Sequence, residues 1–392
     1  MSRFVQLHVL TSYPPSNLNR DDLGRPKSAL VGGVARLRVS SQSGKRAWRT
    51  SDLFQDALAG HLGTRTKTLG LEIFKKLAQI ETIDAESLKH FKEAKFKLAH
   101  EGTRKIIEQF GSLEADYPPK KVKAHAPDDA SNDESKADDD SGDKALKAFR
   151  KSLSTSQLVH ISPAEHALID ALTNKLADAA RLPTAQELEL LREDHHAVDI
   201  ALFGRMLAEK PRFNIEAAAQ VAHAFTVHKA SAEDDYFTAV DDLNRGERDA
   251  GAAHIGEAGF GAGVYYLYVC INRDLLDTNL GGDTTLRNKA LAALLEAIAK
   301  VAPTGKQASF ASRAYASYML VEKGSQQPRS LSLAFVKPVN GTDMIQDSIE
   351  ALNDKRQNMD KVYGDCADAR KFFNAETGEG SLAELIAFAQ AD

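Results

Sequence analysis

Hydrophobic and polar residues alternate near the start of the chain, which is the pattern of a half-buried β-strand. The first alternating segment is Phe4–Leu10. A second segment places Leu37 and Val39 on one side and Arg36 and Arg38 on the other. We therefore expect two strands near the N-terminus.

A helical pattern follows these strands. It begins at about Ser41–Leu58 and continues to about residue 192, with apolar residues at steps of three and four, as in "TLGLEIFKKLAQI". Within it, residues 124–143 combine low hydrophobicity with dense acidic charge. Such a segment cannot bury enough apolar surface to offset the entropy of ordering it, so we predict a disordered acidic loop there.

The remainder of the chain mixes strands and helices. A glycine-rich turn, "HIGEAGFGAG", precedes the clearest strand, "VYYLYVCIN", and a further strand is expected at "RSLSLAFV". Strands on both sides of a helical stretch indicate an α+β sheet domain interrupted by an α-helical one. Amphipathic helices are expected at Leu286–Val301, Ile345–Tyr363 and Ser381–Ala391.

Charge is unevenly distributed along the chain. The 392 residues have a formal net charge of −5, yet residues 1–50 hold nine lysines and arginines against two aspartates. The rest of the chain therefore carries a net charge of −12. Because a polyanion site needs a local basic footprint rather than a basic protein, this asymmetry keeps nucleic acid among the expected partners.

Composition argues against several other classes of protein. A hydrophobic content of 43% and a charged content of 27% are those of an ordinary globular protein. Cys270 and Cys366 are far apart and in no ligand-like spacing, which disfavours a disulfide scaffold or a zinc site and fits a reducing cytoplasm. His223 and His228 do not share a helix face, so we expect structural histidines. No segment resembles a signal peptide or a membrane span, and a soluble cytoplasmic protein is expected.

The helix start in "RVSSQSGKRAWR" carries the most distinctive chemistry. Ser40 is an N-cap candidate. Cations near a helix N-terminus meet the positive end of the helix dipole, and this arrangement becomes favourable when an anion binds there. We hypothesise a phosphate clamp, and the alternative is a solvated basic face. The residues of this face, at steps of three and four, are Gln42, Lys45, Arg46 and Arg49.

Five segments of the chain, taken in order, resemble a known family. They resemble the CasC-type backbone subunit, of the RAMP superfamily, in the type I-E CRISPR Cascade surveillance complex. The resemblance is dense over roughly residues 1–55 and 195–275, weaker in the C-terminal third, and interrupted by the acidic stretch. The segments are "HVLTSYPPSNLNRDDLGRPK", "RVSSQSGKRAWR", "VDIALFGRM", "DYFTAVDDL" and "AAHIG…GVYYLYVCIN".

The resemblance implies a fold of three parts. The palm is a modified RNA-recognition-type, ferredoxin-like fold made of residues 1–59 and 193–392. An α-helical fingers domain is inserted at residues 60–192. An extended β-hairpin thumb spans about residues 229–258.

The resemblance also implies a non-catalytic function, the binding of guide RNA (crRNA) in antiviral defence. Copies of the protein would polymerise head to tail along the RNA, kink it periodically and present its bases for pairing with target DNA, alongside other Cascade subunits. No cofactor and no metal are implied. By similarity, the phosphate contacts are Arg20, Lys27, Ser40, Gln42, Lys45, Arg46 and Arg49. The wedges between bases are Met206, Tyr236, Phe237, Thr238 and Val240, with Tyr236 standing where tryptophan is expected.

Other interpretations of these residues stay open. Adjacent aromatics such as Tyr236 and Phe237 belong to a hydrophobic core more often than to a ligand site. Asp21 and Asp22 are turn-capping candidates, but they also support the alternative hypothesis of a guide-loaded, metal-dependent endoribonuclease. A purely structural subunit, whose RNA contacts belong to its partners, is a third possibility.

Overall fold

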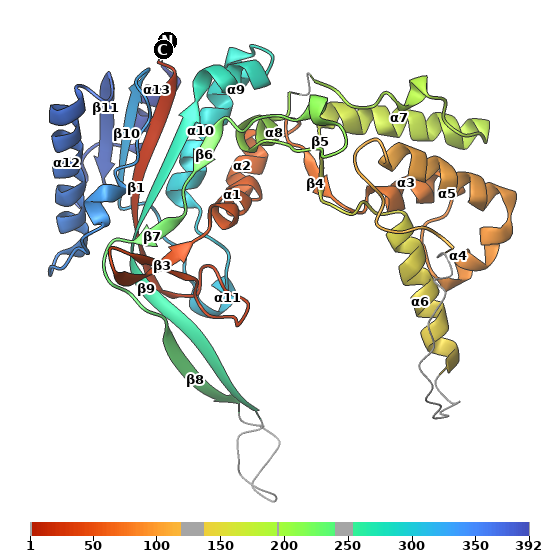
Figure 1. The fold of residues 1–392 in the computed structure, drawn as a ribbon, viewed down its shortest axis with the longest axis horizontal. Coiled ribbons are helices and arrows are strands. Elements are labelled where there is room, and N and C mark those ends of the chain that lie inside the picture. The colour runs from red at the N-terminus through yellow and green to blue at the C-terminus, as the bar shows by residue number, and fades with distance from the viewer. Residues whose placement is uncertain (1, 119–136, 194–195, 240–253, 392) are drawn as a thin grey trace, which may run out of the picture. The chain divides into compact units, whose positions relative to one another are not determined.

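The computed structural model describes residues 2–118, 137–193, 196–239 and 254–391. The chain divides into two compact units (Figure 1). The sheet unit combines Met1–Ala59 with Ala218–Asp392, and the helical unit is Gly60–Ala217. The predicted α+β class is confirmed in that helices and an antiparallel sheet make up the structure.

The main sheet is antiparallel and has the order β11-β10-β1-β9-β7-β3-β2, with β6 and β8 also paired to β9. Leu7 at its centre lies opposite Val269 of β9 and Val321 of β10. The strands are β1 (Phe4–Ser16), β2 (Ser28–Val31), β3 (Val34–Val39), β6 (Ala219–Val221), β7 (Ala224–Thr226), β8 (Glu233–Ala239), β9 (His254–Asn272), β10 (Tyr318–Gly324) and β11 (Ala369–Asn374).

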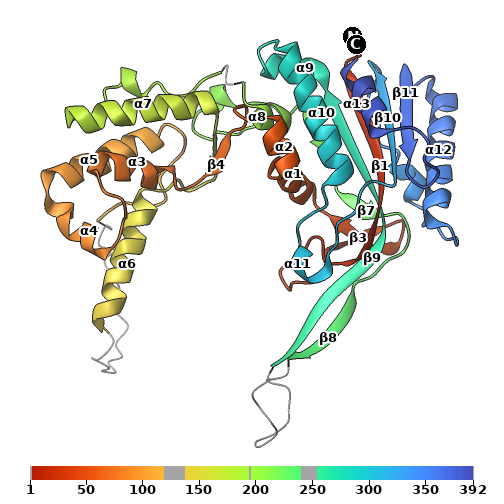
Figure 2. The same cartoon turned by 180° about the vertical axis from the view of Figure 1, so that it is seen from behind.

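Helices cover both faces of this sheet (Figures 1 and 2). On one face, α10 (Thr284–Lys300) packs against α13 (Leu382–Gln390), α1 (Ser41–Arg49) and α2 (Asp52–Ala57). On the other face, α12 (Met344–Tyr363) packs with the 3-10 helix Ser332–Phe335 over an apolar cluster. The helix α9 (Arg273–Asn279) follows β9, and the short α11 is Gln307–Phe310.

Strand β9 is longer than predicted. The glycine-rich segment expected to be a turn is part of the strand, which runs over His254–Asn272. Glycine is needed there because neighbours come close: a Cβ atom at Gly261 would lie 2.4 Å from Leu37 Cδ1, and one at Gly263 would lie 2.6 Å from His228 Nε2. The glycines permit close packing inside the strand and do not mark its end.

The helix predicted for Ser41–Leu58 is two helices. α1 ends at Arg49, and Ser51 starts α2 by accepting a hydrogen bond on its side chain from Phe54 N at 3.3 Å. Trp48 and Phe54 are both buried, so each helix keeps an apolar side in the core despite the break.

The C-terminal predictions are right for the helices and wrong for the strand. α10, α12 and α13 confirm the expected amphipathic helices. The segment "RSLSLAFV" contains a 3-10 helix, because Leu331 and Phe335, four residues apart, are buried while Leu333 between them is exposed. The strands of this region are β10 and β11, which the sequence pattern did not predict.

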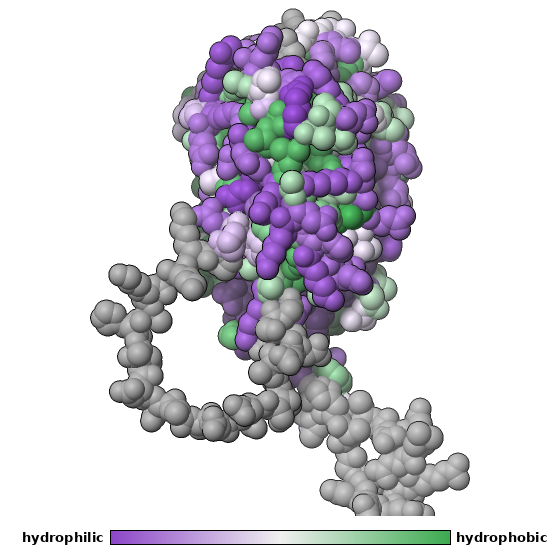
Figure 3. Space-filling model, turned by 90° about the vertical axis from the view of Figure 1, so that its right-hand side faces the viewer, coloured by the Kyte–Doolittle hydropathy of each residue, from purple (hydrophilic) through white to green (hydrophobic). Residues whose placement is uncertain are grey.

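The helical unit is built from short strands and several helices around one core. Figure 3 presents a face on which hydrophilic residues surround a smaller hydrophobic patch. Its elements are β4 (Thr64–Thr66), α3 (Leu69–Ala78), α4 (Ala85–Lys89), the 3-10 helix His90–Lys92, α5 (Ala94–Ile107), α6 (Ala137–Ser152), β5 (Val159–Ile161), α7 (Pro163–Ala179), the 3-10 helix Gln186–Leu188, α8 (Val198–Phe203) and the 3-10 helix Pro211–Phe213.

Helix α6 corrects the predicted acidic loop. Residues 124–136 of that loop lie outside the described residues, but residues 137–143 are helical. Leu146 and Phe149 pack into the core of the helical unit. These contacts stabilise a helix whose acidic start alone does not predict one.

An imidazole belongs to the aromatic core of the helical unit. The His100 ring stacks on the Phe149 ring with centroids 5.3 Å apart, and its Nε2 lies 2.9 Å from Ser152 Oγ. Burial, with the nearby charge of Arg104, lowers the pKa of His100 to about 4. The folded state therefore favours the neutral form of the His100 imidazole.

The helical unit extends to Ala217, beyond residue 192 where the predicted fingers domain ends. Polar contacts hold the additional segment. The Asp199 carboxylate lies 2.8 Å from His160 Nε2 and accepts a hydrogen bond from Gly63 N at 2.8 Å. Arg205 forms a buried ion pair with Glu165. Partners so far apart in sequence leave no local pattern, which is why periodicity did not place this boundary.

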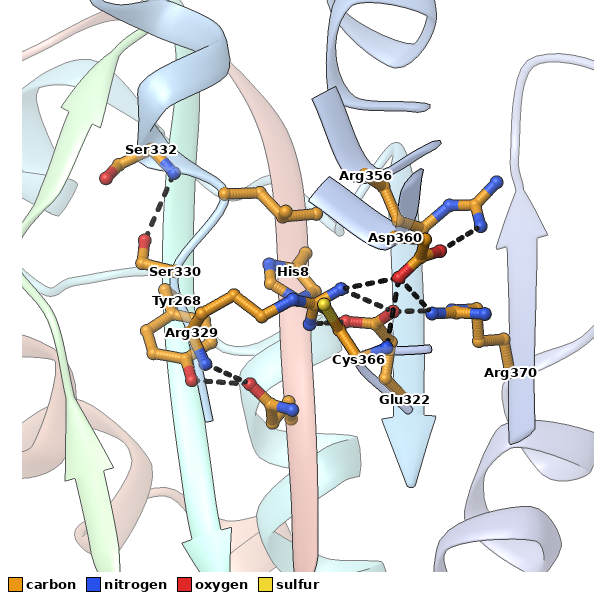
Figure 4. Close-up of polar contacts among 12 residues, drawn as sticks. His8, Tyr268, Glu322, Arg329, Ser330, Ser332, Arg356, Asp360, Cys366 and Arg370 are labelled. Atoms are coloured by element: carbon orange, nitrogen blue, oxygen red, sulfur yellow. Dashed lines mark hydrogen bonds and ion pairs between the residues drawn. The ribbon is translucent and has the colours of Figure 1, made fainter. Parts of the chain in front are cut away.

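A buried polar cluster lies between the sheet and α12 (Figure 4). The fully buried Glu322 accepts hydrogen bonds from Arg329 and, at 2.6 Å, from Arg370 Nε, and His8 Nε2 lies 3.1 Å from it. Asp360 of α12 accepts from Arg370 at 2.9 Å. Burial opposes ionisation of Glu322, but hydrogen bonds from His8 and Arg329 outweigh it and hold its pKa well below the ordinary value. Because these charges satisfy one another, the cluster ties α12 and β11 to the sheet.

Candidate nucleic-acid interface

The start of α1 is fixed by the loop that follows β1. Ser40 caps the helix, since its side-chain oxygen accepts a hydrogen bond from Ser43 N at 3.3 Å. Asn19 Oδ1 accepts from Ser40 N at 2.9 Å, and Asn19 O accepts from Lys27 N at 2.8 Å. One asparagine therefore holds the helix start beside the loop that carries Arg20 and Lys27.

The phosphate contacts expected on α1 lie on its outer side. Gln42 and Arg46 are exposed, Lys45 and Arg49 are half-buried, and Trp48 is buried. The first turn of this fully described helix contains no acidic residue. Partial burial lowers the pKa of Lys45, because desolvation disfavours its charged form. A bound anion would compensate for that desolvation.

Two further cations of the expected site come from the loop. Arg20 is exposed and lines a surface hollow of about 510 Å³ together with Ser43 of α1. Lys27 is half-buried beside β3, where its carbonyl oxygen accepts from Arg38 N at 2.8 Å. Among the described residues, no carboxylate pairs with Arg20, Lys27 or Arg46. The described part of the chain therefore leaves two cations of the loop and one of α1 without a carboxylate partner.

Three other arginines of the basic N-terminal segment have partners within the sheet unit. Arg36 is fully buried and donates to two backbone carbonyl oxygens, at 3.1 and 3.0 Å. Arg38 Nη1 lies 3.0 Å from His223 Nδ1, and Arg25 donates to Asp234 at 2.7 Å. Fewer basic residues are therefore available to bind an anion than the sequence count suggests.

The hollow also contains residues that the sequence analysis did not identify. Thr304 and Gly305 line it, and they come from the C-terminal third, where the resemblance is weak. Gly305 lies so close to the loop that a Cβ atom on it would be 2.3 Å from Leu18 O. No motif or charge run marks this segment, and only the fold brings it beside Arg20.

Asp21 and Asp22 line the same hollow. Asp21 Oδ1 accepts hydrogen bonds from the backbone N–H groups of Leu23 and Arg25, each at 2.9 Å. This is the turn-capping arrangement that aspartate favours. In the described part of the chain, no group of three or more histidine, cysteine, aspartate or glutamate side chains is arranged to hold a metal ion.

The expected wedge residues of the thumb lie on the hairpin of β8 and β9, which extends beyond the rest of the sheet (Figure 1). Tyr236 is 65% exposed and Phe237 is 45% exposed, and Thr238 is exposed as well. The interpretation of these adjacent aromatics as core residues is therefore wrong. Val240 lies outside the described residues.

The base of the hairpin is tied to the loop after β1. Asn17 Nδ2 donates to Gly259 O at 2.8 Å, and this bond is buried. Pro26 packs against the same glycine, where a Cβ atom would lie 3.0 Å from Pro26 Cδ. The Arg25–Asp234 pair adds a third link between loop and hairpin. One loop therefore supports both the expected phosphate contacts and the exposed aromatic residues.

Met206 belongs to the helical unit and is 74% exposed. The backbone on each side of it is held in place. Arg205 exchanges backbone hydrogen bonds with Ile215, at 3.0 and 2.9 Å, and Leu207 N donates to Asn214 Oδ1 at 2.6 Å. Met206 is therefore an exposed side chain on an ordered loop and not a core residue.

A family model described as "CT1975-like protein" matches residues 5–390. The chain belongs to the CT1975-like protein family. It is also similar to a chain of a "CRISPR RNA-guided surveillance complex, pre-nicking", with 28% identity, a TM-score of 0.72, and coverage of 98% of this chain and 100% of that one. A chain of a second "CRISPR RNA-guided surveillance complex" shows 25% identity and a TM-score of 0.54, with coverage of 97% and 92%. No curated protein sequence matches the chain.

These similarities extend over nearly the whole length of the chain. They confirm the sequence-based resemblance at the level of a CRISPR surveillance complex subunit. Among the described helices, none combines the length and the apolar character that a membrane span requires.

Proposed function

We propose that the chain is a non-catalytic, cytoplasmic subunit that binds the guide RNA of a type I-E CRISPR surveillance complex. The observation that carries this proposal is a set of unneutralised cations, Arg20 and Lys27 in the loop that holds the capped start of α1 and Arg46 in the last turn of that helix. Similarity to chains of RNA-guided surveillance complexes supports RNA as the polyanion. Backbone phosphates are the part of RNA that such a surface binds independently of sequence.

In this proposal each part of the chain has a separate role. The sheet unit is the RNA-recognition-type palm, the helical unit is the fingers, and the β8–β9 hairpin is the thumb. Ser40 acts indirectly, since its side chain caps α1. The side chains that hold phosphates are Arg20, Lys27, Gln42, Lys45, Arg46 and Arg49.

The exposed apolar residues act on the bases. Tyr236 and Phe237 are flanked by Asp234 and Asp235, which repel phosphates, so the hairpin contacts bases by stacking. Met206 inserts in the same way, and the RNA is kinked at intervals while the remaining bases pair with target DNA. Successive copies follow one another head to tail along the RNA, which an open, non-closing interface allows.

The competing function is a metal-dependent ribonuclease that uses Asp21 or Asp22. It has less support, because Asp21 Oδ1 already accepts two backbone hydrogen bonds. We expect no cleavage of guide-paired RNA in the presence of magnesium. Cleavage that requires magnesium and disappears in Asp22→Ala would establish the nuclease instead.

The proposal is tested by the binding of single-stranded RNA across a salt series. Wild type should lose affinity with a slope of about 0.7 per neutralised phosphate. Lys45→Ala/Arg46→Ala/Arg49→Ala should lower the affinity at 0.1 M salt by roughly 25- to 125-fold and reduce the slope by about 1.4 to 2.1, the share of two to three phosphates.

A matched control removes the same charge at the opposite edge of the sheet. Lys355→Ala/Lys361→Ala/Lys371→Ala alters α12 and β11, whereas α1 follows β3 near the other edge. This control should bind like wild type. Salt-independent binding by wild type, or equal binding by the two triple variants, would overturn the proposed site and leave a purely structural subunit.

A further inference from the structure

The segment Thr304–Ala311 has a strained backbone. Lys306 (φ 43°) and Ala311 (φ 47°) both adopt the left-handed conformation, on either side of α11. Residues other than glycine seldom adopt it, and they persist there only where the surrounding structure holds them. The segment is therefore held in one shape at a cost in stability, which indicates a functional constraint.

Two contacts hold this shape. Gly305 packs on the loop after β1, where a Cβ atom would lie 2.3 Å from Leu18 O and 2.5 Å from Asn17 O. At the other end, the Phe310 ring lies over the Phe260 ring of β9, with centroids 6.2 Å apart. The segment is thus fixed against the loop that leads directly to Arg20.

The result is a hollow with walls from three parts of the chain. Arg20 comes from the loop after β1, Ser43 from α1, and Thr304 and Gly305 from the strained segment. Lys306 is the next residue and is half-buried. Among the described residues, its ammonium group makes no hydrogen bond or ion pair. A second unneutralised cation therefore directly follows two residues that line the hollow with Arg20.

The positive and negative charges in and next to the hollow nearly cancel. Asp21 and Asp22 line it together with Arg20, and Lys306 directly follows the lining residues Thr304 and Gly305. One Asp21 oxygen is occupied by backbone N–H donors. Among the described residues that line the hollow, Arg20 is the single cation beside these two carboxylates, so an additional cation next to the hollow would favour the binding of a phosphate.

We propose that Thr304–Lys306 is the third wall of the RNA site and that Lys306 binds a backbone phosphodiester beside the one held by Arg20. The inference rests on the proposed RNA binding and adds to it a segment that no motif marks. The volume of about 510 Å³ accommodates a nucleotide-sized ligand. Lys306 thus belongs to the site even though its sequence neighbourhood resembles the family only weakly.

The experiment uses the full-length protein and a fluorescein-labelled single-stranded oligouridine over a salt series. Lys306→Ala should lower affinity about fivefold at 0.1 M salt and reduce the salt slope by about 0.7, the share of one phosphate. Lys289→Ala is the matched control, because Lys289 is an exposed lysine of α10 that does not line the hollow. It should bind like wild type.

Three more variants separate lost contact from lost structure. Lys306→Gly removes the charge and relieves the strained backbone, so it should lose the same affinity with an unchanged or higher melting temperature. Gly305→Ala keeps the ammonium but displaces the segment from Leu18, and should also weaken binding. Lys306→Arg should restore most of the affinity.

The outcomes are distinct. If wild type binds with the expected salt slope while Lys306→Ala and Lys306→Gly bind like Lys289→Ala, the third wall is disproved and the proposed function stands. If wild type shows no salt-dependent binding, the proposed function fails and the inference fails with it.

Discussion

The guanidinium of Arg205 and the carboxylate of Glu165 form an ion pair at 2.7 Å, with both side chains excluded from solvent. Glu165 also accepts hydrogen bonds from Ser162 N at 2.9 Å and Arg192 N at 3.0 Å. The pair fixes the backbone that immediately precedes Met206. The exposed methionine therefore stands on a rigid support whose charges are already satisfied.

Loosening this support should affect base stacking without affecting phosphate binding. Asn214→Ala removes the hydrogen bond to Leu207 N on the other side of Met206 and alters only an exposed residue. We expect RNA affinity and salt slope to change by less than about twofold, because no phosphate contact is lost. The fluorescence of 2-aminopurine in bound RNA, which rises when a base unstacks, should fall toward the value of Met206→Ala.

The control for this measurement is Asn340→Ala, an exposed loop asparagine of the sheet unit. It should leave the fluorescence unchanged. If Met206→Ala loses the signal and Asn214→Ala keeps it, the methionine acts without the support described above.

Tyr236 should contribute to RNA binding through stacking alone. Tyr236→Ala is expected to cost about 1–3 kcal/mol of binding free energy, and Tyr236→Trp should bind more tightly than wild type because its ring is larger. Since the side chain is neutral, the salt slope should stay the same in both variants. Titrations at several salt concentrations measure the two quantities, and a changed slope would show that the ring acts through the phosphates.

The stability of the helical unit should depend on His100. Its pKa in the fold is about 4 against an ordinary value of 6.5, so between these values the unfolded chain binds more protons and stability rises with pH. We expect the free energy of unfolding to fall by about 3 kcal/mol as the pH drops from 6.5 to 4. Hydrogen exchange of the α5 and α6 amides measures this. His100→Phe, which retains an aromatic ring against Phe149, should lose most of the dependence.

Glu322 should be the main acid-sensitive group of the sheet unit. Glu322→Gln leaves Arg329 and Arg370 without their shared carboxylate, and we expect a loss of about 3–5 kcal/mol. Because the folded pKa lies below the ordinary 4.5, the contribution of Glu322 is present above that pH and is lost as the pH falls further.

Denaturant titrations followed by the fluorescence of Trp48 measure this loss of stability. Trp48 is a suitable probe because it is the single tryptophan of the chain and is buried in the sheet unit. Wild type should lose more stability than Glu322→Gln between about pH 5 and pH 2. Glu376→Gln, at an exposed position, is the control. Equal acid sensitivity of wild type and Glu322→Gln would assign the acid transition to another group.

Local patterns were sufficient for the elements whose environment follows from their own residues. Alternation predicted β1 and β3, and helical spacing grouped Gln42, Lys45, Arg46 and Arg49, none of which is buried in α1. The capping role of Ser40 also follows from residue type. The cap forms between residues three apart, whereas the strands were predicted from their own alternation although their pairing partners are distant.

Features set by distant partners could not be predicted in this way. Alternation predicts that Arg36 and Arg38 lie on the same polar side of β3. Arg36 is instead buried, because its guanidinium donates hydrogen bonds to the carbonyl oxygens of Thr226 and Phe335. The sequence pattern predicts Glu322 as a surface charge after an apolar run, but its partners His8, Arg329 and Arg370 come from three other segments. The wall formed by Thr304 and Gly305 depends on a backbone contact with Leu18, far away in sequence.

The first strand of the chain pairs with strands that are synthesised long after it. Phe4 lies opposite Asn272 on one side and Gly324 on the other, while Gly60–Ala217 forms a compact unit in between. Contacts between such distant residues form late, and the inserted unit can fold before them. On the ribosome, β1 and the helix start behind it therefore remain unpaired until most of the chain has emerged. Under the proposed function, a nascent copy therefore lacks the completed surface that would bind RNA.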